Sequence, residues 1–158
     1  MTGTHLQPAS FRSLREQGFT LIEMLVVMTV LAIMLAVGVP SFRNFVAGQK
    51  VKTASYDLMT ALVLARSEAI KRNTDVTVAP DTANVWIGGW TVKAGATTLV
   101  QQQSLSGVTV TKAPTSVVYK SNGRPTAGSN FEVSGSNSVK CVKVDLTGIP
   151  SSQTAACP

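Results

Sequence analysis

The sequence Gly18-Phe19-Thr20-Leu21-Ile22-Glu23-Met24-Leu25 opens an apolar run that extends to Val39 and is followed by Pro40. The 21 residues from Phe19 to Val39 contain one charged side chain, that of Glu23. At a rise of about 1.5 Å per residue, a helix of this length is about 30 Å long and crosses the hydrocarbon core of a bilayer. The run therefore predicts a membrane-spanning helix.

Glu23 is the unusual residue of this span. A carboxylate costs roughly 2.5–3.5 kcal/mol at the centre of a membrane helix and less near the interface. A charge kept in such a place generally has a partner, so we interpret Glu23 as a functional residue. The alternative is a carboxylate that only extends to the lipid headgroups.

The residues before the span indicate its orientation. Arg12 and Arg15 flank its N-terminal side, and basic residues stay in the cytoplasm, so everything after Val39 is expected outside. A secretory signal has a shorter apolar region followed by a small-residue cleavage site. Here the small residue, Gly18, precedes the apolar region, which suggests a cut that keeps the span in the mature protein.

Gly38 and Pro40 close the span, because proline removes a helix hydrogen bond and glycine weakens a helix further. The helical pattern nevertheless resumes at once. Its apolar residues recur at spacings of three and four: Val51, Ala54, Leu58, Ala61, Leu62, Ala65 and Ala69. We predict one long kinked helix over residues 19–72, with an amphipathic upper half.

After Asn73 the sequence has the two-residue period and the turn residues of β-strands. Short strands are predicted at residues 76–78, 85–87, 90–92, 99–103, 108–111, 116–119, 131–133 and 139–144, with a hairpin or bulge at Gly88-Gly89 and a turn at residues 121–125. About 85 residues of short strands cannot form a large core alone, so the amphipathic half-helix should pack on them. Trp86 and Trp90 are interpreted as core aromatics rather than a ligand platform. The expected class is α+β.

The charge of the chain is unevenly distributed. The formal net charge is +6, but residues 41–73 carry six bases against two acids, whereas residues 74–158 carry six against four. A C-terminal region at +2 is a weak electrostatic footprint for nucleic acid.

The two cysteines, Cys141 and Cys157, lie late in the chain. If this region leaves the cytosol it enters an oxidising compartment, where a disulfide is expected. The alternatives are two unrelated thiols or a metal site, and the sole histidine, His5, lies ahead of the span.

The stretch Gly18–Glu23 resembles the processing site of type IV prepilins and type II secretion pseudopilins. The resemblance implies that a prepilin peptidase cuts between Gly18 and Phe19 and methylates the new amino terminus. In such a family the carboxylate of Glu23 would be neutralised by the Phe19 nitrogen of a neighbouring subunit. Residues 65–72, Trp90 after two glycines, and the Asn-Gly-Arg turn are similar to the GspH/FimT branch of the family.

The resemblance implies a pilin fold, with a kinked helix packed on a C-terminal antiparallel sheet domain. The expected regions are a leader at 1–18, a transmembrane half-helix at 19–40, an amphipathic half-helix at 41–73 and a β-rich head at 74–158. The chain would be a minor pilin in the inner membrane, with its head in the periplasm and other pilin subunits and an assembly platform as partners. The rival functions are an H-type pseudopilin and a DNA-receptor minor pilin.

The sequence contains no constellation typical of an enzyme, a metal site or a cofactor site. DNA-receptor members of the branch carry a basic glycine-arginine motif near the C-terminus, and the matching stretch here, residues 146–152, has Ile149 where the arginine would stand. A remaining basic patch could form from Lys120, Arg124, Lys140 and Lys143. The alternative is a solvated face of the sheet, and DNA binding is not favoured.

Overall fold

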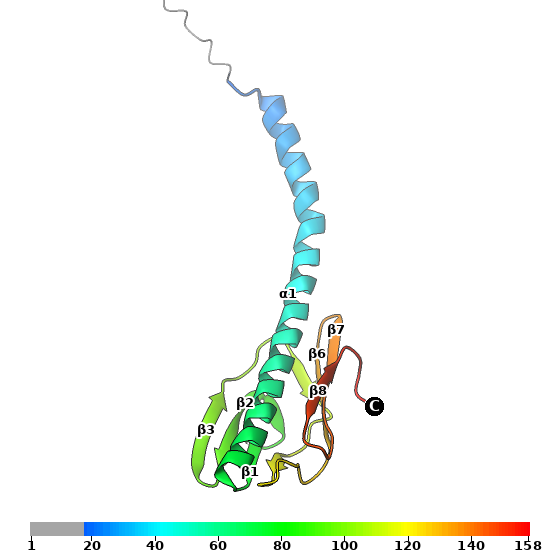
Figure 1. Cartoon of the computed structure of the whole chain (residues 1–158). Helices are drawn as coiled ribbons and strands as arrows, with labels where there is room; N and C mark the ends of the chain where they lie inside the picture. Colours follow the sequence, from blue (N-terminus) through cyan, green and yellow to red (C-terminus); the bar gives the residue numbers. More distant parts are fainter. Residues whose placement is uncertain (1–17) are drawn as a thin grey trace, which may run out of the picture. The chain divides into compact units, whose positions relative to one another are not determined.

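The computed structural model describes residues 18–158 (Figure 1). The expected leader lies outside the described residues except for Gly18. The chain divides into two compact units between Gly38 and Val39. Helix α1, Leu21–Arg72, belongs to both units. It confirms the prediction of one long helix.

The residue that follows α1, Asn73, explains why the helix ends there. Asn73 adopts a left-handed conformation (φ 51°), which asparagine tolerates better than most residues. Its amide donates to the Ile70 carbonyl at 3.3 Å, and the Thr74 amide donates to the Ala69 carbonyl at 3.2 Å. These two bonds form a Schellman motif, which satisfies carbonyls left free at the helix end and turns the chain into the first strand.

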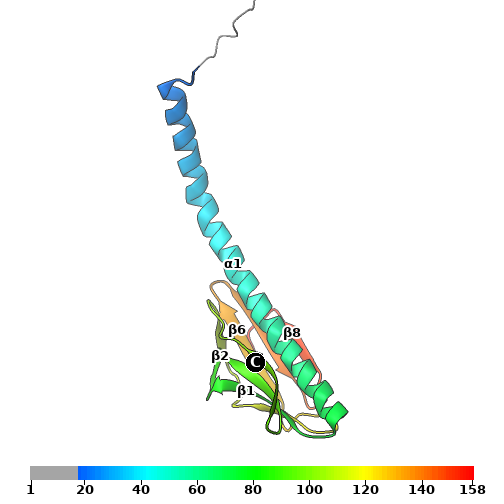
Figure 2. The ribbon, with the colours of Figure 1, turned by 90° about the vertical axis from the view of Figure 1, so that its left-hand side faces the viewer.

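The strands of the head form two antiparallel four-stranded sheets, of order β3-β2-β1-β5 and β4-β6-β7-β8. Their bounds are β1 Val76–Thr82, β2 Val85–Ala94, β3 Thr97–Gln102, β4 Thr109–Thr111, β5 Val117–Tyr119, β6 Ser129–Gly135, β7 Ser138–Val144 and β8 Pro150–Gln153. Val78 pairs with Val92 in the first sheet, and Phe131 pairs with Val142 in the second. The part of α1 after Val39 lies along the head (Figures 1 and 2).

The predicted hairpin at Gly88-Gly89 is wrong, since both glycines lie within the continuous strand β2. The alternative of a local irregularity is supported, because the register between β1 and β2 shifts between Pro80 and Thr82. Gly89 has a φ of 104°, and a Cβ there would overlap the Gln102 carbonyl oxygen. The glycine is thus required by a close approach of β3. The turn lies instead before Val85, at Asn84 (φ 62°).

The core of the head joins α1 to both sheets. Every residue of the predicted apolar stripe, from Val51 to Ala69, is buried. Trp86 and Trp90 are also buried, which confirms their interpretation as core residues. The Trp86 ring packs edge-on against Phe131 of the other sheet, with centroids 4.8 Å apart, and its Nε1 donates to the Pro114 carbonyl at 2.7 Å. This contact fastens the two sheets together.

Two neighbouring residues of α1 test this packing. Leu62 is 0% exposed, whereas Val63 is 51% exposed. We expect Leu62→Ala to lower the free energy of unfolding by about 2–5 kcal/mol, because it leaves a cavity between α1 and the sheets. Val63→Ala should change it by about 0.5 kcal/mol or less. Denaturant unfolding of the two variants in detergent measures both, and equal effects would contradict the assigned helix face.

Candidate assembly sites

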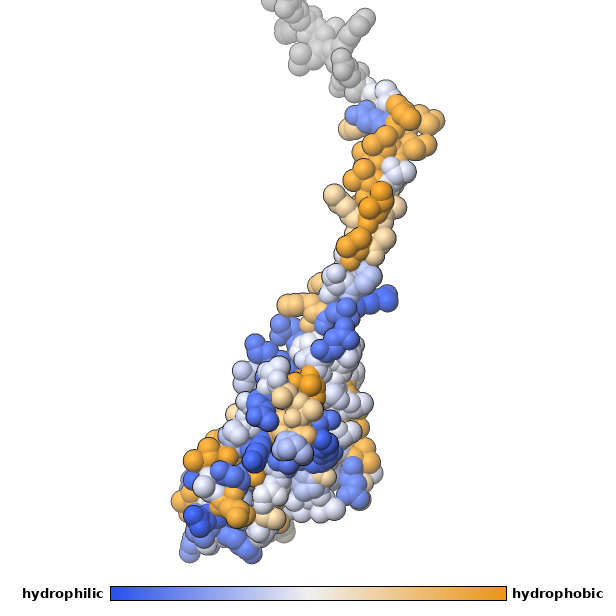
Figure 3. Space-filling view, turned by 90° about the vertical axis from the view of Figure 1, so that its right-hand side faces the viewer, coloured by the Kyte–Doolittle hydropathy of each residue, from blue (hydrophilic) through white to orange (hydrophobic). Residues whose placement is uncertain are grey.

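The N-terminal half of α1 presents an apolar surface. Every residue from Gly18 to Phe45 is exposed, and α1 is the one helix among residues 18–158 that is long and apolar enough to cross a membrane. Figure 3 shows hydrophobic side chains over most of this surface, with polar ones near its two ends. A surface of this kind is stable in lipid or against other apolar helices.

Glu23 and Thr20 cap the start of α1. The Glu23 amide donates to the Thr20 hydroxyl at 3.2 Å, and the Thr20 amide donates to the Glu23 carboxylate at 3.4 Å. These reciprocal bonds are a capping box, which satisfies two amide donors at a helix end. Sequence reasoning missed the role of Thr20, although a threonine three residues before a glutamate at the head of an apolar run is the signature of such a cap.

The cap determines where the carboxylate of Glu23 is held. The carboxylate lies at the positive end of the α1 dipole. The amide that it contacts is that of Thr20, which directly follows Phe19 along the chain. An ionised carboxylate has about four acceptor positions, so one long bond to the Thr20 amide leaves room for a further donor. The position therefore suits a carboxylate that receives a cation while it still caps its own helix.

Gly38 and Pro40 lie inside α1 and do not end it. Proline at position 40 lacks the amide hydrogen that would bond to a carbonyl one turn earlier. The helix is thus weakened at this point, and a bend there remains a prediction.

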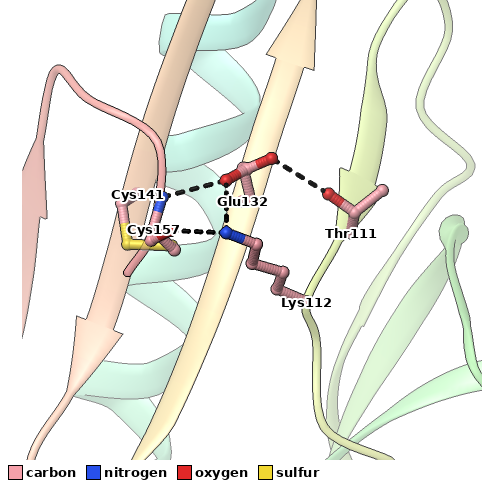
Figure 4. The surroundings of a disulfide bond; sticks show 5 residues. All are labelled: Thr111, Lys112, Glu132, Cys141 and Cys157. Atoms are coloured by element: carbon pink, nitrogen blue, oxygen red, sulfur yellow. Dashed lines mark hydrogen bonds and ion pairs between the residues drawn. A yellow bond between two sulfur atoms is a disulfide. The ribbon is translucent and has the colours of Figure 1, made fainter.

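The disulfide between Cys141 and Cys157 is present, which confirms the expected pairing (Figure 4). Cys141 lies opposite Glu132 in the β6–β7 pair, so the bond brings the Cys157 amide next to the Glu132 carboxylate. That amide donates to Glu132 at 2.9 Å. Lys112 Nζ donates to the Cys157 carbonyl at 2.5 Å and forms an ion pair with Glu132 Oε2 at 3.4 Å. We call these four residues the C-terminal clamp.

The clamp shifts the acidity of Glu132. The hydrogen bond from the Cys157 amide, with a smaller effect from the charge of Lys112, holds the pKa of the Glu132 carboxyl below its ordinary value against the opposing effect of desolvation. The ionised carboxylate is therefore part of what fixes the C-terminal tail to the sheet.

Two of the four predicted DNA-contact residues lie in the loop after β5, and two lie on β7. Lys120, which follows β5, forms an ion pair with Asp75 at 2.6 Å, and Arg124 lies exposed in the next turn. Lys140 and Lys143 lie three residues apart on β7, so they project from opposite faces of the strand. Lys140 donates to the Thr154 hydroxyl at 3.3 Å. Their role in DNA binding stays a prediction.

Comparison with known protein families identifies the family of this chain. Residues 54–148 match the family described as type II transport protein GspH, and residues 13–39 match the prokaryotic N-terminal methylation motif. The chain belongs to the GspH family. A curated relative, prepilin peptidase-dependent protein D of Escherichia coli K12, is 27% identical over 112 residues, which cover 63% of this chain and 73% of that protein.

Two solved structures share the fold of this GspH-family chain. The type IV minor pilin FimU of Pseudomonas aeruginosa PAO1 superposes with a TM-score of 0.59, covering 67% of this chain and 96% of FimU. The minor pseudopilin EpsH from the type 2 secretion system of Vibrio cholerae superposes with a TM-score of 0.52, covering 66% of this chain and 97% of EpsH. Both are 17% identical in sequence, so the likeness concerns the fold. The pilin-like α+β class predicted from the sequence is confirmed.

The clamp predicts a pH-dependent stability. A carboxyl whose pKa is lowered by folding stabilises the protein above its unfolded pKa, and this contribution is lost as the pH falls through the folded value. We expect Glu132→Gln to lower Tm by a few degrees at pH 7 and to unfold like the wild type at a pH below the pKa of the folded carboxyl. Thermal unfolding across this range measures the effect. As a control, Asp75→Asn breaks an exposed ion pair and should have little effect at either pH.

Proposed function

We propose that this GspH-family chain is a minor pilin subunit of a type IV pilus, with a structural role in filament assembly. The observation that carries the proposal is one helix, α1, that begins with an exposed apolar half headed by Glu23 and continues into the core of the family-matched head. Such a helix suits a subunit that is stored in a membrane and then packed among the helices of other subunits.

In this proposal the chain is processed before it assembles. A prepilin peptidase cuts after Gly18 and the amino group of Phe19 is methylated, as the methylation motif over residues 13–39 supports. The new cation at Phe19 of one subunit then meets the Glu23 carboxylate of the next and sets the axial register. In lipid this attraction is strong because the dielectric is low, and it relieves the cost of the buried carboxylate.

The proposed location is the inner membrane, with a single span, a cytoplasmic N-terminus and a periplasmic head. An oxidising compartment agrees with the Cys141–Cys157 disulfide. The partners are other pilin subunits, the prepilin peptidase and an assembly platform in the inner membrane. Gly38 and Pro40 would let α1 bend or partly unwind as it enters the filament. We propose no enzymatic activity and no cofactor.

The second candidate is an H-type pseudopilin of a type II secretion system, which is favoured by the description of the matched family. The two assemblies use the same helix chemistry, so the genes adjacent to this one are the most informative observation. A gel-shift assay with duplex DNA tests the DNA-receptor alternative.

Processing makes a direct prediction. When the chain is coexpressed with a prepilin peptidase, mass spectrometry of the membrane-bound protein should identify Phe19 as the first residue, with a methylated amino group. Gly18→Val should abolish the cut, because the peptidase requires the small residue. A mature chain that begins elsewhere would leave Glu23 without the proposed cationic partner.

A second prediction concerns Glu23 itself. We expect Glu23→Ala to insert into the membrane as the wild type does but to enter filaments about tenfold less, which corresponds to a loss of about 1.4 kcal/mol. Immunoblots of membranes and sheared filaments measure both steps. Met24→Ala removes a neighbouring apolar side chain as a matched control and should assemble normally. Normal assembly of Glu23→Ala would overturn the register role.

A further inference from the structure

Four large apolar side chains are exposed on the head, two on the C-terminal part of α1 and two in the turn before β8. They are Val63 (51% exposed), Ile70 (52%), Leu146 (62%) and Ile149 (57%). We call them the α1/β8 patch. Figure 3 shows hydrophobic side chains gathered at this end of the head, among otherwise mostly polar surface. Exposed apolar groups that gather in this way mark interaction surfaces more often than scattered ones do.

Three of the four patch residues line a shallow hollow of about 240 Å³. Its lining consists of Val63, Arg66, Ser67, Ile70, Ile149 and Pro150. The hollow is therefore mainly apolar, and Arg66 is the one charged residue in its lining. A side chain that entered it would lose water on apolar contacts and meet a positive charge at the edge.

The turn that carries Leu146 and Ile149 is rigidly built. The Asp145 carboxylate accepts hydrogen bonds from the amide and the hydroxyl of Thr147, and the Gly148 amide donates to the Asp145 carbonyl at 3.0 Å. The hydrogen bond from the Thr147 hydroxyl, with a smaller effect from the Thr147 amide, lowers the pKa of the Asp145 carboxyl against the opposing effect of desolvation, so the carboxylate stays ionised and holds the turn.

The same turn is locked against its neighbour. Gly148 (φ 81°) lies so close to the Gly123 carbonyl oxygen that a Cβ would overlap it. Arg66 Nε donates to that same oxygen at 3.2 Å. The apolar side chains are thus presented by a backbone that loses little further freedom on binding, which favours association.

The charges near the patch select against some partners. Arg66 lies in the hollow, and Arg124 lies exposed in the turn that contains Gly123. The Asp145 carboxylate is occupied by its own turn. A partner with apolar side chains and a carboxylate therefore fits better than a nucleic acid, whose phosphates gain nothing from Leu146 and Ile149.

A surface of this complementary kind exists on another flank of the same head. A hollow of about 150 Å³ lies between α1 and the first sheet. It is lined by Asp57, Thr60, Ala61, Leu64, Trp90, Val100 and Gln102. Asp57 is the one charged residue in this lining, so the second hollow is apolar with an acidic edge.

We propose that the α1/β8 patch of one chain docks into the Asp57 hollow of a second copy of the chain. The two surfaces differ, so the contact is heterologous and leaves a free patch and a free hollow at its two ends. Such a contact does not close into a dimer, so one patch and one hollow stay available to other pilin subunits. The inference rests on the proposed function, because side-by-side anchoring in a membrane supplies the high effective concentration that a small interface needs.

Site-specific cross-linking of the full chain in membranes tests the proposal. One copy carries Ile149→Cys and a second, differently tagged copy carries Val100→Cys. The native cysteines are joined in a disulfide, so a short bis-maleimide reacts with the introduced thiols alone. We expect a yield of the mixed dimer at least about fivefold above that of a control pair in which Asn137→Cys, an exposed position in the turn between β6 and β7, replaces Ile149→Cys.

Two added substitutions refine the test. Leu146→Asp in the first copy and Asp57→Lys in the second should each lower the yield to the control level. Leu146→Asp buries a charge against apolar side chains, and Asp57→Lys places a second cation beside Arg66 of the partner copy. Equal yields for the Ile149 and Asn137 pairs would overturn the proposal without reliance on these substitutions. Yields that are unchanged by both substitutions would overturn it as well.

These experiments separate docking between two copies from nucleic-acid binding and from failure of the proposed function. If the wild type but not Leu146→Asp shifts duplex DNA in a gel, and no specific cross-link forms, then the patch binds nucleic acid and the proposal is overturned. The N-terminal mass tests processing independently. A chain that cross-links as expected but does not begin at Phe19 would keep the docking surface and lose the pilin function.

Discussion

The head depends on the burial of one stripe of α1 against two sheets. Neither sheet is self-sufficient, because each has four strands and contributes one apolar face to the common core. The stripe carries four alanines, whose small side chains let the helix approach the sheets closely, while Leu58 and Leu62 fill the space between them. The core therefore fixes the position of α1 from Val51 to Ala69.

Because only its second half packs on the sheets, α1 has two environments along its length. Its first half is exposed and apolar, and its second half is buried along one stripe and polar elsewhere. The helix joins the two without a break at Pro40. A capping box at Thr20–Glu23 and a Schellman motif at Asn73 satisfy backbone groups that a helix otherwise leaves free at its two ends.

Irregular segments of the head are held by local polar contacts rather than by the core. The C-terminal clamp ties the tail to the second sheet through a disulfide, an amide and an ion pair. The Asp145 turn is tied through its own amides and through the contact of Gly148 with Gly123. Both arrangements use an ionised carboxylate to order backbone that has no strand partner, and both leave side chains outside the core free to meet another molecule.

The sequence by itself determined the helix, the buried stripe, the core tryptophans and the disulfide. These follow from signals that are local or strongly periodic: an apolar run, spacings of three and four, and two cysteines in an exported region. The position of Glu23 in a specific processing motif was equally visible. The capping role of Thr20 was readable in the same residues, but it was overlooked beside the charge of Glu23.

Only the tertiary structure decided how the strands pair and what lies on the surface. Strand β8, Pro150–Gln153, is short and polar and has no alternation that would reveal it, and its existence depends on pairing with β7. The glycines at 88 and 89 read as a turn, but the approach of β3 places them inside a strand. The α1/β8 patch joins residues about 80 positions apart, and such a juxtaposition arises from sheet order, which depends on long-range pairing that no local pattern encodes.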